Sequence, residues 1–167
     1  MDVGTLSALE RLARCLEDQL AALQHLSFKF EVQEAVLASG RQRWLDQTTR
    51  ELELSVDALH GTDTALRAAL PTMAVAVGLS PEATVREIAA AVPEPWSYVF
   101  TEHRASLQAA VERVALSSRT NRRLLAAGYA ATAAALAFLG AEVPVGYDAT
   151  GAPTPVTGSL GLLDARA

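Results

Sequence analysis

The chain has 167 residues, of which half are apolar and only 5% aromatic, and its formal net charge is −5. This length fits one domain, and an apolar fraction rich in alanine favours packed helices over a sheet sandwich. The negative charge argues against a general nucleic-acid-binding surface. The single cysteine, Cys15, excludes an internal disulfide and any multi-cysteine metal site. The composition therefore predicts an all-α protein.

The first eighteen residues carry several charges and contain no apolar core segment, so they do not read as a secretory signal. We therefore expect a cytoplasmic protein. The most apolar stretch, Leu124 to Leu139, has about 16 residues and is built largely on alanine. It is shorter than the ~20 residues that a membrane span needs, so we expect no stable membrane insertion.

A first long helix is predicted from Thr5 to Ser39. Large apolar residues recur in it at a spacing of seven: Leu9, Leu16, Leu23, Phe30 and Leu37. The intermediate position of the same stripe is occupied by Leu6, Ala13 and Leu20. Repeats of this length are typical of helices paired in a coiled-coil-like hairpin. Gly40 is expected to end the helix, as glycine commonly does at a helix C-terminus.

A second long helix is predicted from Arg41 to Val77. It has the same spacing of seven, supported by Val56 and Leu70: Leu45, Leu52, Leu59, Leu66 and Met73. Because the connection between the two helices is short, they should lie antiparallel as neighbours. Pro71 predicts a kink or a helix boundary near Leu70.

A short connecting helix is predicted from Pro81 to Ala91. Ser80 would serve as its N-cap, with proline at the first helical position and Glu82 in the first turn. Pro93 and Pro95 end this helix, because each proline disfavours helix in the residue before it. The aromatic residues that follow are expected to cap the end of the bundle: Trp96, Tyr98 and Phe100.

A third long helix is predicted from about Glu94 to Ala141. One stripe runs along it: Phe100, Leu107, Val111, Val114, Ser118, Asn121, Leu125, Gly128, Thr132, Leu136 and Leu139. Charged residues flank the stripe as far as Arg123, but from Leu124 the helix is apolar nearly all round and has to be covered. The chain has limited material to cover it, so we expect a partner to do so. Asn121, the polar residue on this seam, either fixes helix register or contacts the partner.

The remaining residues, 142–167, are rich in proline and glycine, and we expect a flexible tail after a helical domain of residues 1–141. Sequence signatures of catalysis are missing: there is no Glu-x-x-His pair, phosphate loop, nucleophile elbow or metal-spaced cluster. We therefore predict a protein that is not an enzyme and holds no cofactor or metal. A histidine phosphotransfer bundle using His60 is an alternative, although no basic residue follows shortly after this histidine.

Two motifs carry a resemblance. Asn121-Arg122-Arg123-Leu124-Leu125 lies on the third helix, and Tyr147-Asp148-Ala149-Thr150-Gly151 follows in the tail. Together with the two seven-residue repeats, they make nearly the whole chain resemble the FlgN-type flagellar export chaperones. The repeats by themselves fit many coiled coils, so the two spaced motifs are the more specific part.

The resemblance implies a cytoplasmic, non-enzymatic chaperone that binds the C-terminal segments of the hook–filament junction proteins FlgK and FlgL. It would keep them unpolymerised and deliver them to the flagellar type III export gate. The implied cargo-binding residues are Asn121, Leu124, Leu125, Gly128, Tyr129, Thr132, Leu136, Phe138 and Leu139. Tyr147 is a candidate contact for the export gate. The alternative is a coiled-coil oligomerisation module in which the same apolar face pairs with a second copy of the chain.

Overall fold

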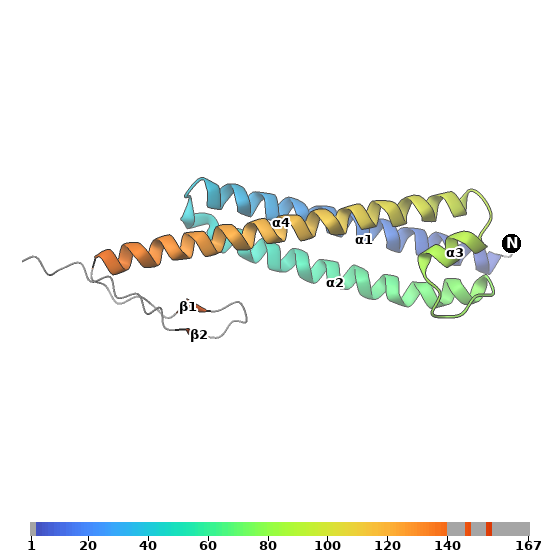
Figure 1. The fold of residues 1–167 in the computed structure, drawn as a ribbon. Coiled ribbons are helices and arrows are strands. Elements are labelled where there is room, and N and C mark those ends of the chain that lie inside the picture. The colour runs from blue at the N-terminus through green and yellow to red at the C-terminus, as the bar shows by residue number, and fades with distance from the viewer. Residues whose placement is uncertain (1–2, 140–145, 148–152, 155–167) are drawn as a thin grey trace, which may run out of the picture. The chain divides into compact units, whose positions relative to one another are not determined.

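The structure is a computed structural model that describes residues 3–139, 146–147 and 153–154. It confirms the all-α prediction, with three long helices and two short ones (Figure 1). In chain order they are α1 (Val3–Ala38), the 3₁₀ helix η1 (Gln42–Trp44), α2 (Leu45–Ala76), α3 (Val85–Ala91) and α4 (Trp96–Phe138). The described residues contain no helix that is long and apolar enough to cross a membrane.

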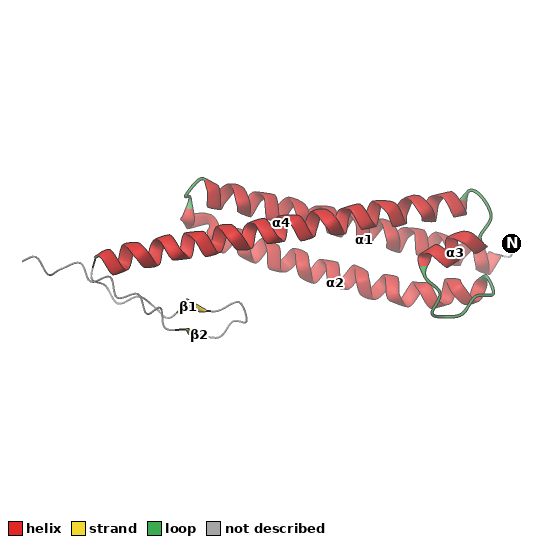
Figure 2. Ribbon diagram, in the orientation of Figure 1, coloured by secondary structure: helices red, strands yellow, loops and turns green. Residues whose placement is uncertain are grey.

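Two very short strands follow the helices, β1 (Gly146–Tyr147) and β2 (Pro153–Thr154), and they pair antiparallel (Figure 2). The predicted flexible tail otherwise lies outside the described residues. The chain groups into two compact units, residues 1–122 and 123–167, so that helix α4 contributes to both. The predicted domain boundary at residue 141 stays a prediction.

The directions of the helices in the first unit follow from the contacts between them. Gln19 and Gln33 of α1 contact Thr62 and Thr49 of α2, respectively, so these two helices are antiparallel, as the short connection predicted. Helix α4 runs parallel to α1. His103 of α4 contacts Glu17 of α1, and Asn121, further along α4, contacts Phe30, further along α1.

The seven-residue repeats of α1 and α2 lie on the faces that the two helices bury. Leu9 and Leu16 are fully buried in α1, and Leu52 and Met73 are buried in α2. Leu23 of α1 is buried as well, at 5% exposure. The other five predicted members are half-buried: Phe30, Leu37, Leu45, Leu59 and Leu66. The spacing therefore identified the correct primary seam in both helices.

The second seam position was predicted only in part, because Ala13 and Leu70 pack against the core cluster while deeper burial lies on other positions. Leu6 is 41% exposed, and Ala13, Leu20, Val56 and Leu70 are only half-buried. The structure places the second seam three residues after each primary position: Leu12, Gln19, Leu26 and Gln33 in α1, and Thr48, Ser55, Thr62 and Ala69 in α2. These positions mix leucine and alanine with amides and small hydroxyls.

Side-chain hydrogen bonds pair the polar groups of this seam inside the hairpin. Gln33 donates to the Thr49 hydroxyl at 3.1 Å, and the Thr62 hydroxyl donates to the Gln19 side-chain oxygen. Thr48 and Ser55 donate back to carbonyls of their own helix, at 2.9 and 2.8 Å. Buried polar groups cost little once they are paired in this way, and small side chains let the two helices approach closely.

Large apolar side chains gather near the N-terminus of α1, where the C-terminal part of α2, helix α3 and the start of α4 meet. The buried members of this core cluster are Leu9, Leu12, Leu16, Ala69, Met73, Ala74, Ile88, Ala89, Val92 and Phe100. Trp96 packs against the cluster, with its ring centroid 6.0 Å from that of Phe100. The aromatic prediction was therefore right for these two residues but wrong for Tyr98, which is 64% exposed.

Glycines end both hairpin helices. Gly40 and Gly78 adopt φ values of +68° and +75°, which favour glycine because it has no Cβ. Beyond Gly78, the Leu79 N–H reaches the Ala74 carbonyl at 2.9 Å, which closes the last turn of α2. Of the two alternatives predicted at Pro71, a kink or a boundary, the boundary was wrong, because Pro71 lies inside α2 and the helix continues to Ala76.

The start of the short helix was also predicted incorrectly. Helix α3 begins at Val85, and its N-cap is Thr84 instead of Ser80. Thr84 accepts from the Glu87 N–H at 3.3 Å, and the Glu87 carboxylate accepts from the Thr84 N–H at 2.8 Å. This reciprocal capping box satisfies two helix-end donors, whereas Ser80-Pro81-Glu82 provides no reciprocal bond and forms a turn.

The core cluster generates the first prediction. Met73 is fully buried, so Met73→Ala should lower the free energy of unfolding by about 2–5 kcal/mol through lost burial and a residual cavity. Leu54 in the same helix is 67% exposed, so Leu54→Ala should change the free energy of unfolding by less than about 0.5 kcal/mol. Urea titration followed by circular dichroism measures both, and equal effects would contradict this core.

The capping box generates a prediction about pH. Hydrogen bonds from the backbone N–H and the hydroxyl of Thr84 lower the pKa of the Glu87 carboxyl from 4.5. A lowered folded-state pKa gives stability that is present above the unfolded-state pKa and lost as pH falls through the folded-state value. Between about pH 5 and pH 3, Tm should fall more in the wild type than in Glu87→Gln, which keeps an amide cap. Glu82→Gln is the charge-matched control and should behave as the wild type.

Candidate functional site

Asn121 lies inside the first unit, not on its surface. Its side chain is 2% exposed, and Nδ2 donates to the Phe30 carbonyl oxygen of α1 at 2.8 Å. The other amide atom, Oδ1, is buried without a hydrogen-bond partner. This placement supports the first of the two predicted roles, because one specific bond between α4 and α1 holds the two helices in a defined register.

The rest of the predicted binding surface, residues 123–139, lies in the second unit, which has its own set of contacts. Its largest apolar side chains are open to solvent: Leu125 is 37% exposed, Tyr129 46%, Phe138 90% and Leu139 75%. Leu124 and Leu136 are half-buried. Large apolar side chains exposed close together mark interaction surfaces more often than isolated ones do.

Small residues occupy the turns between these apolar side chains. A Cβ added to Gly128 would meet no other atom within 4 Å beyond its own helix, so the helix surface is open there. Four residues on, the Thr132 hydroxyl donates to the Gly128 carbonyl at 2.9 Å. The structure therefore places Leu125, Gly128, Tyr129 and Thr132 along one exposed stretch of helix that another backbone can approach closely.

Tyr147, the candidate contact for the export gate, lies in strand β1. Its backbone pairs with Pro153 of β2. Its side chain lies outside the described residues, so this assignment stays a prediction.

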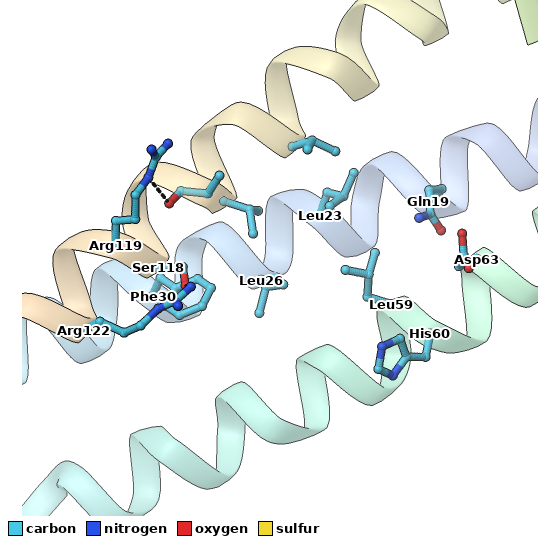
Figure 3. A pocket seen from close by; sticks show the side chains of 13 residues that line it. Gln19, Leu23, Leu26, Phe30, Leu59, His60, Asp63, Ser118, Arg119 and Arg122 are labelled. Atoms are coloured by element: carbon cyan, nitrogen blue, oxygen red, sulfur yellow. Dashed lines mark hydrogen bonds between the residues drawn. The ribbon is translucent and has the colours of Figure 1, made fainter. Parts of the chain in front are cut away.

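The structure also contains a groove that the sequence analysis did not identify. It has a volume of about 850 Å³ and lies among α1, α2 and the middle of α4 (Figure 3). We call it the three-helix groove; it is lined by Gln19, Leu23, Leu26, Phe30, Leu59, His60, Asp63, Val111, Val114, Ala115, Ser118, Arg119 and Arg122. Val111, Val114 and Ser118 were predicted on the buried stripe of the third helix, but Val111 is 53% exposed.

The two ends of the three-helix groove differ in charge (Figure 3). Arg119 and Arg122 lie at the end near Phe30, and both are exposed. His60 and Asp63 lie at the opposite end, where the Asp63 carboxylate already accepts from Arg67 at 2.7 Å. Leucine side chains from α1 and α2 form the floor between these ends.

The described residues bear on the two predictions about metal binding and phosphotransfer. They contain no group of three or more His, Cys, Asp or Glu side chains placed to hold a metal ion. His60 is exposed at the edge of the groove, and no described contact favours the phosphotransfer alternative. On another face, Lys29 donates to Glu51 at 2.7 Å and lowers the pKa of that carboxyl, which is the effect of a structural ion pair.

The role of Asn121 generates a stability prediction. Asn121→Asp places a carboxylate oxygen against the Phe30 carbonyl in a buried position, and should cost about 3 kcal/mol because a buried charge is left without a partner. Asn121→Leu removes the unpartnered Oδ1 and should change the free energy of unfolding by less than about 1 kcal/mol. Denaturant titration compares the two variants, and an Asp variant as stable as the Leu variant would rule out the buried position.

Comparison with known proteins agrees with this architecture. A family model described as FlgN protein matches residues 1–155. No curated protein and no solved structure matches the chain. The match spans all four α-helices and both motifs on which the resemblance was based, so the chain belongs to the FlgN family of flagellar export chaperones.

Proposed function

We propose that this protein is a cytoplasmic chaperone for the hook-associated proteins of the FlgK and FlgL type. It binds the amphipathic C-terminal segments of these proteins, prevents their premature polymerisation and delivers them to the flagellar export gate. The observation that carries the proposal is the exposed apolar stretch of α4 from Leu125 to Leu139. Membership of the FlgN family supports a role in flagellar export.

The chemistry of this stretch suits an amphipathic helix. Exposed Leu125, Tyr129 and Phe138 provide anchors, and each apolar side chain that is buried contributes at ~25 cal/mol per Å² of area removed from water. The open surface at Gly128 lets the partner backbone approach closely. Helices that lie in apolar grooves or on apolar faces present matching anchors at every third or fourth residue.

Such a complex is expected to be reversible without nucleotide hydrolysis. Ordering the cargo segment costs free energy, which offsets part of the gain from burial. Competition at the export gate can then release the cargo. In this proposal Tyr147 provides a contact for the gate, because it is the aromatic residue of the tail.

The exposed stretch generates the central prediction. Leu125→Asp should weaken binding of a fluorescent peptide from the cargo C-terminus by at least about tenfold, because a charge replaces an apolar anchor. Gly128→Leu should weaken it similarly by blocking close approach, whereas Gly128→Ala should have a smaller effect. Fluorescence anisotropy measures affinity, and circular dichroism checks that helicity is retained.

Leu116→Asp is the matched control. Leu116 is 63% exposed on the same helix and lies outside both candidate surfaces, so this variant should bind as the wild type does. Unchanged binding by Leu125→Asp and Gly128→Leu would reject the proposed surface. Light scattering that shows a stable dimer, together with no binding of the cargo peptide, would favour the oligomerisation module instead.

A further inference from the structure

We infer that the three-helix groove binds a helical segment of the exported protein that carries an aliphatic stripe and a carboxylate at the end facing Arg119 and Arg122. This inference rests on the proposed function for the identity of the partner, but it assigns a separate surface. It lies entirely within the first unit, on residues 19–122.

The shape of the groove fits a helix better than a small molecule. It follows α1 from Gln19 to Phe30, which at 1.5 Å per residue is about 16 Å, or three turns of a bound helix. The floor contains Leu23 and Leu26, which are 5% and 3% exposed, and Val111 lies at the open edge. Small-molecule sites usually add a few convergent polar groups to an apolar wall, whereas the polar side chains here lie at the two ends of an apolar trough.

The charges give the bound helix a direction. Arg119 donates to the Ala115 carbonyl at 3.1 Å and Arg122 to the Ser118 hydroxyl at 3.0 Å. Among the described residues, no carboxylate lies within 4.0 Å of either guanidinium.

The helix that bears these two arginines cannot supply an acidic partner along its own surface. The sequence contains no Asp or Glu between Glu112 and Glu142. Guanidinium groups form strong, often bidentate, hydrogen bonds with carboxylates. At the opposite end Asp63 is already paired with Arg67. An acidic side chain of the partner therefore fits at the arginine end.

The test uses the full-length chaperone and a labelled peptide from the C-terminal segment of a hook-associated protein, measured by fluorescence anisotropy at low and at physiological salt. The double variant Arg119→Glu/Arg122→Glu should bind at least about tenfold more weakly and lose much of its salt dependence. A peptide whose carboxylates are changed to lysine should recover affinity for this variant. Val111→Asp should also weaken binding, because it places a charge at the edge of the apolar floor.

Arg113→Glu is the matched control, since Arg113 is exposed on the same helix and does not line the groove. If this control weakens binding as much as the double variant, the effect is one of net charge and the inference is overturned. If the groove variants bind normally while Leu125→Asp does not, the inference is overturned and the proposed function stands. If the wild type binds no cargo peptide, both are rejected.

Discussion

The side chains between α1 and α2 differ in size from one end of the hairpin to the other, and the rest of the first unit depends on this difference. At one end large side chains such as Leu12, Met73 and Phe100 fill the space between the helices and bury the start of α4. Further along, the second seam carries Gln19 and Gln33, which bond to hydroxyls of α2. Those bonds hold the hairpin together, but short or polar side chains cannot fill the space that a third helix leaves beside them.

Helix α4 is buried at Phe100 and Ala110, and again at Asn121. Phe100 is fully buried in the core cluster, and Asn121 donates to the Phe30 carbonyl. Between Ala110 and Asn121, helix α4 lines the groove with short side chains that do not close it: Val111, Val114, Ala115 and Ser118. The three-helix groove is the result, and the Asn121 bond joins α4 to α1 next to the two arginines at its end.

The two candidate surfaces differ in chemistry, and this difference suits different parts of a partner. The stretch from Leu125 to Leu139 carries no charge and offers anchors and close backbone approach. The three-helix groove adds two guanidinium groups to a leucine floor. In a protein with a net charge of −5, this local excess of cations attracts an acidic segment while the rest of the surface repels it. Charge thus contributes orientation, and apolar burial contributes most of the affinity.

The sequence by itself determined the helices, because spacing and helix-end residues are local signals. The seven-residue repeats identified the primary seam, and Gly40 marked the first helix end. The Thr84-x-x-Glu87 capping box is a local signal as well, but the prediction placed the helix start at Pro81 from the Ser80-Pro81-Glu82 pattern. Pro71 does not end α2, because Met73 and Ala74 in the following turn are buried in the core cluster and this packing offsets the cost of about 3 kcal/mol that a proline adds inside a helix.

Only the tertiary structure decided which neighbouring position became more deeply buried, because Leu12 and Ala13 are one residue apart and packing buries Leu12 fully while Ala13 stays half-buried. It also showed where Asn121 lies, since a polar residue on a helix stripe can either be buried between helices of its own chain or contact a partner. The three-helix groove could not be predicted, because a groove depends on how far three side-chain layers reach toward one another, and no single helix contains that information.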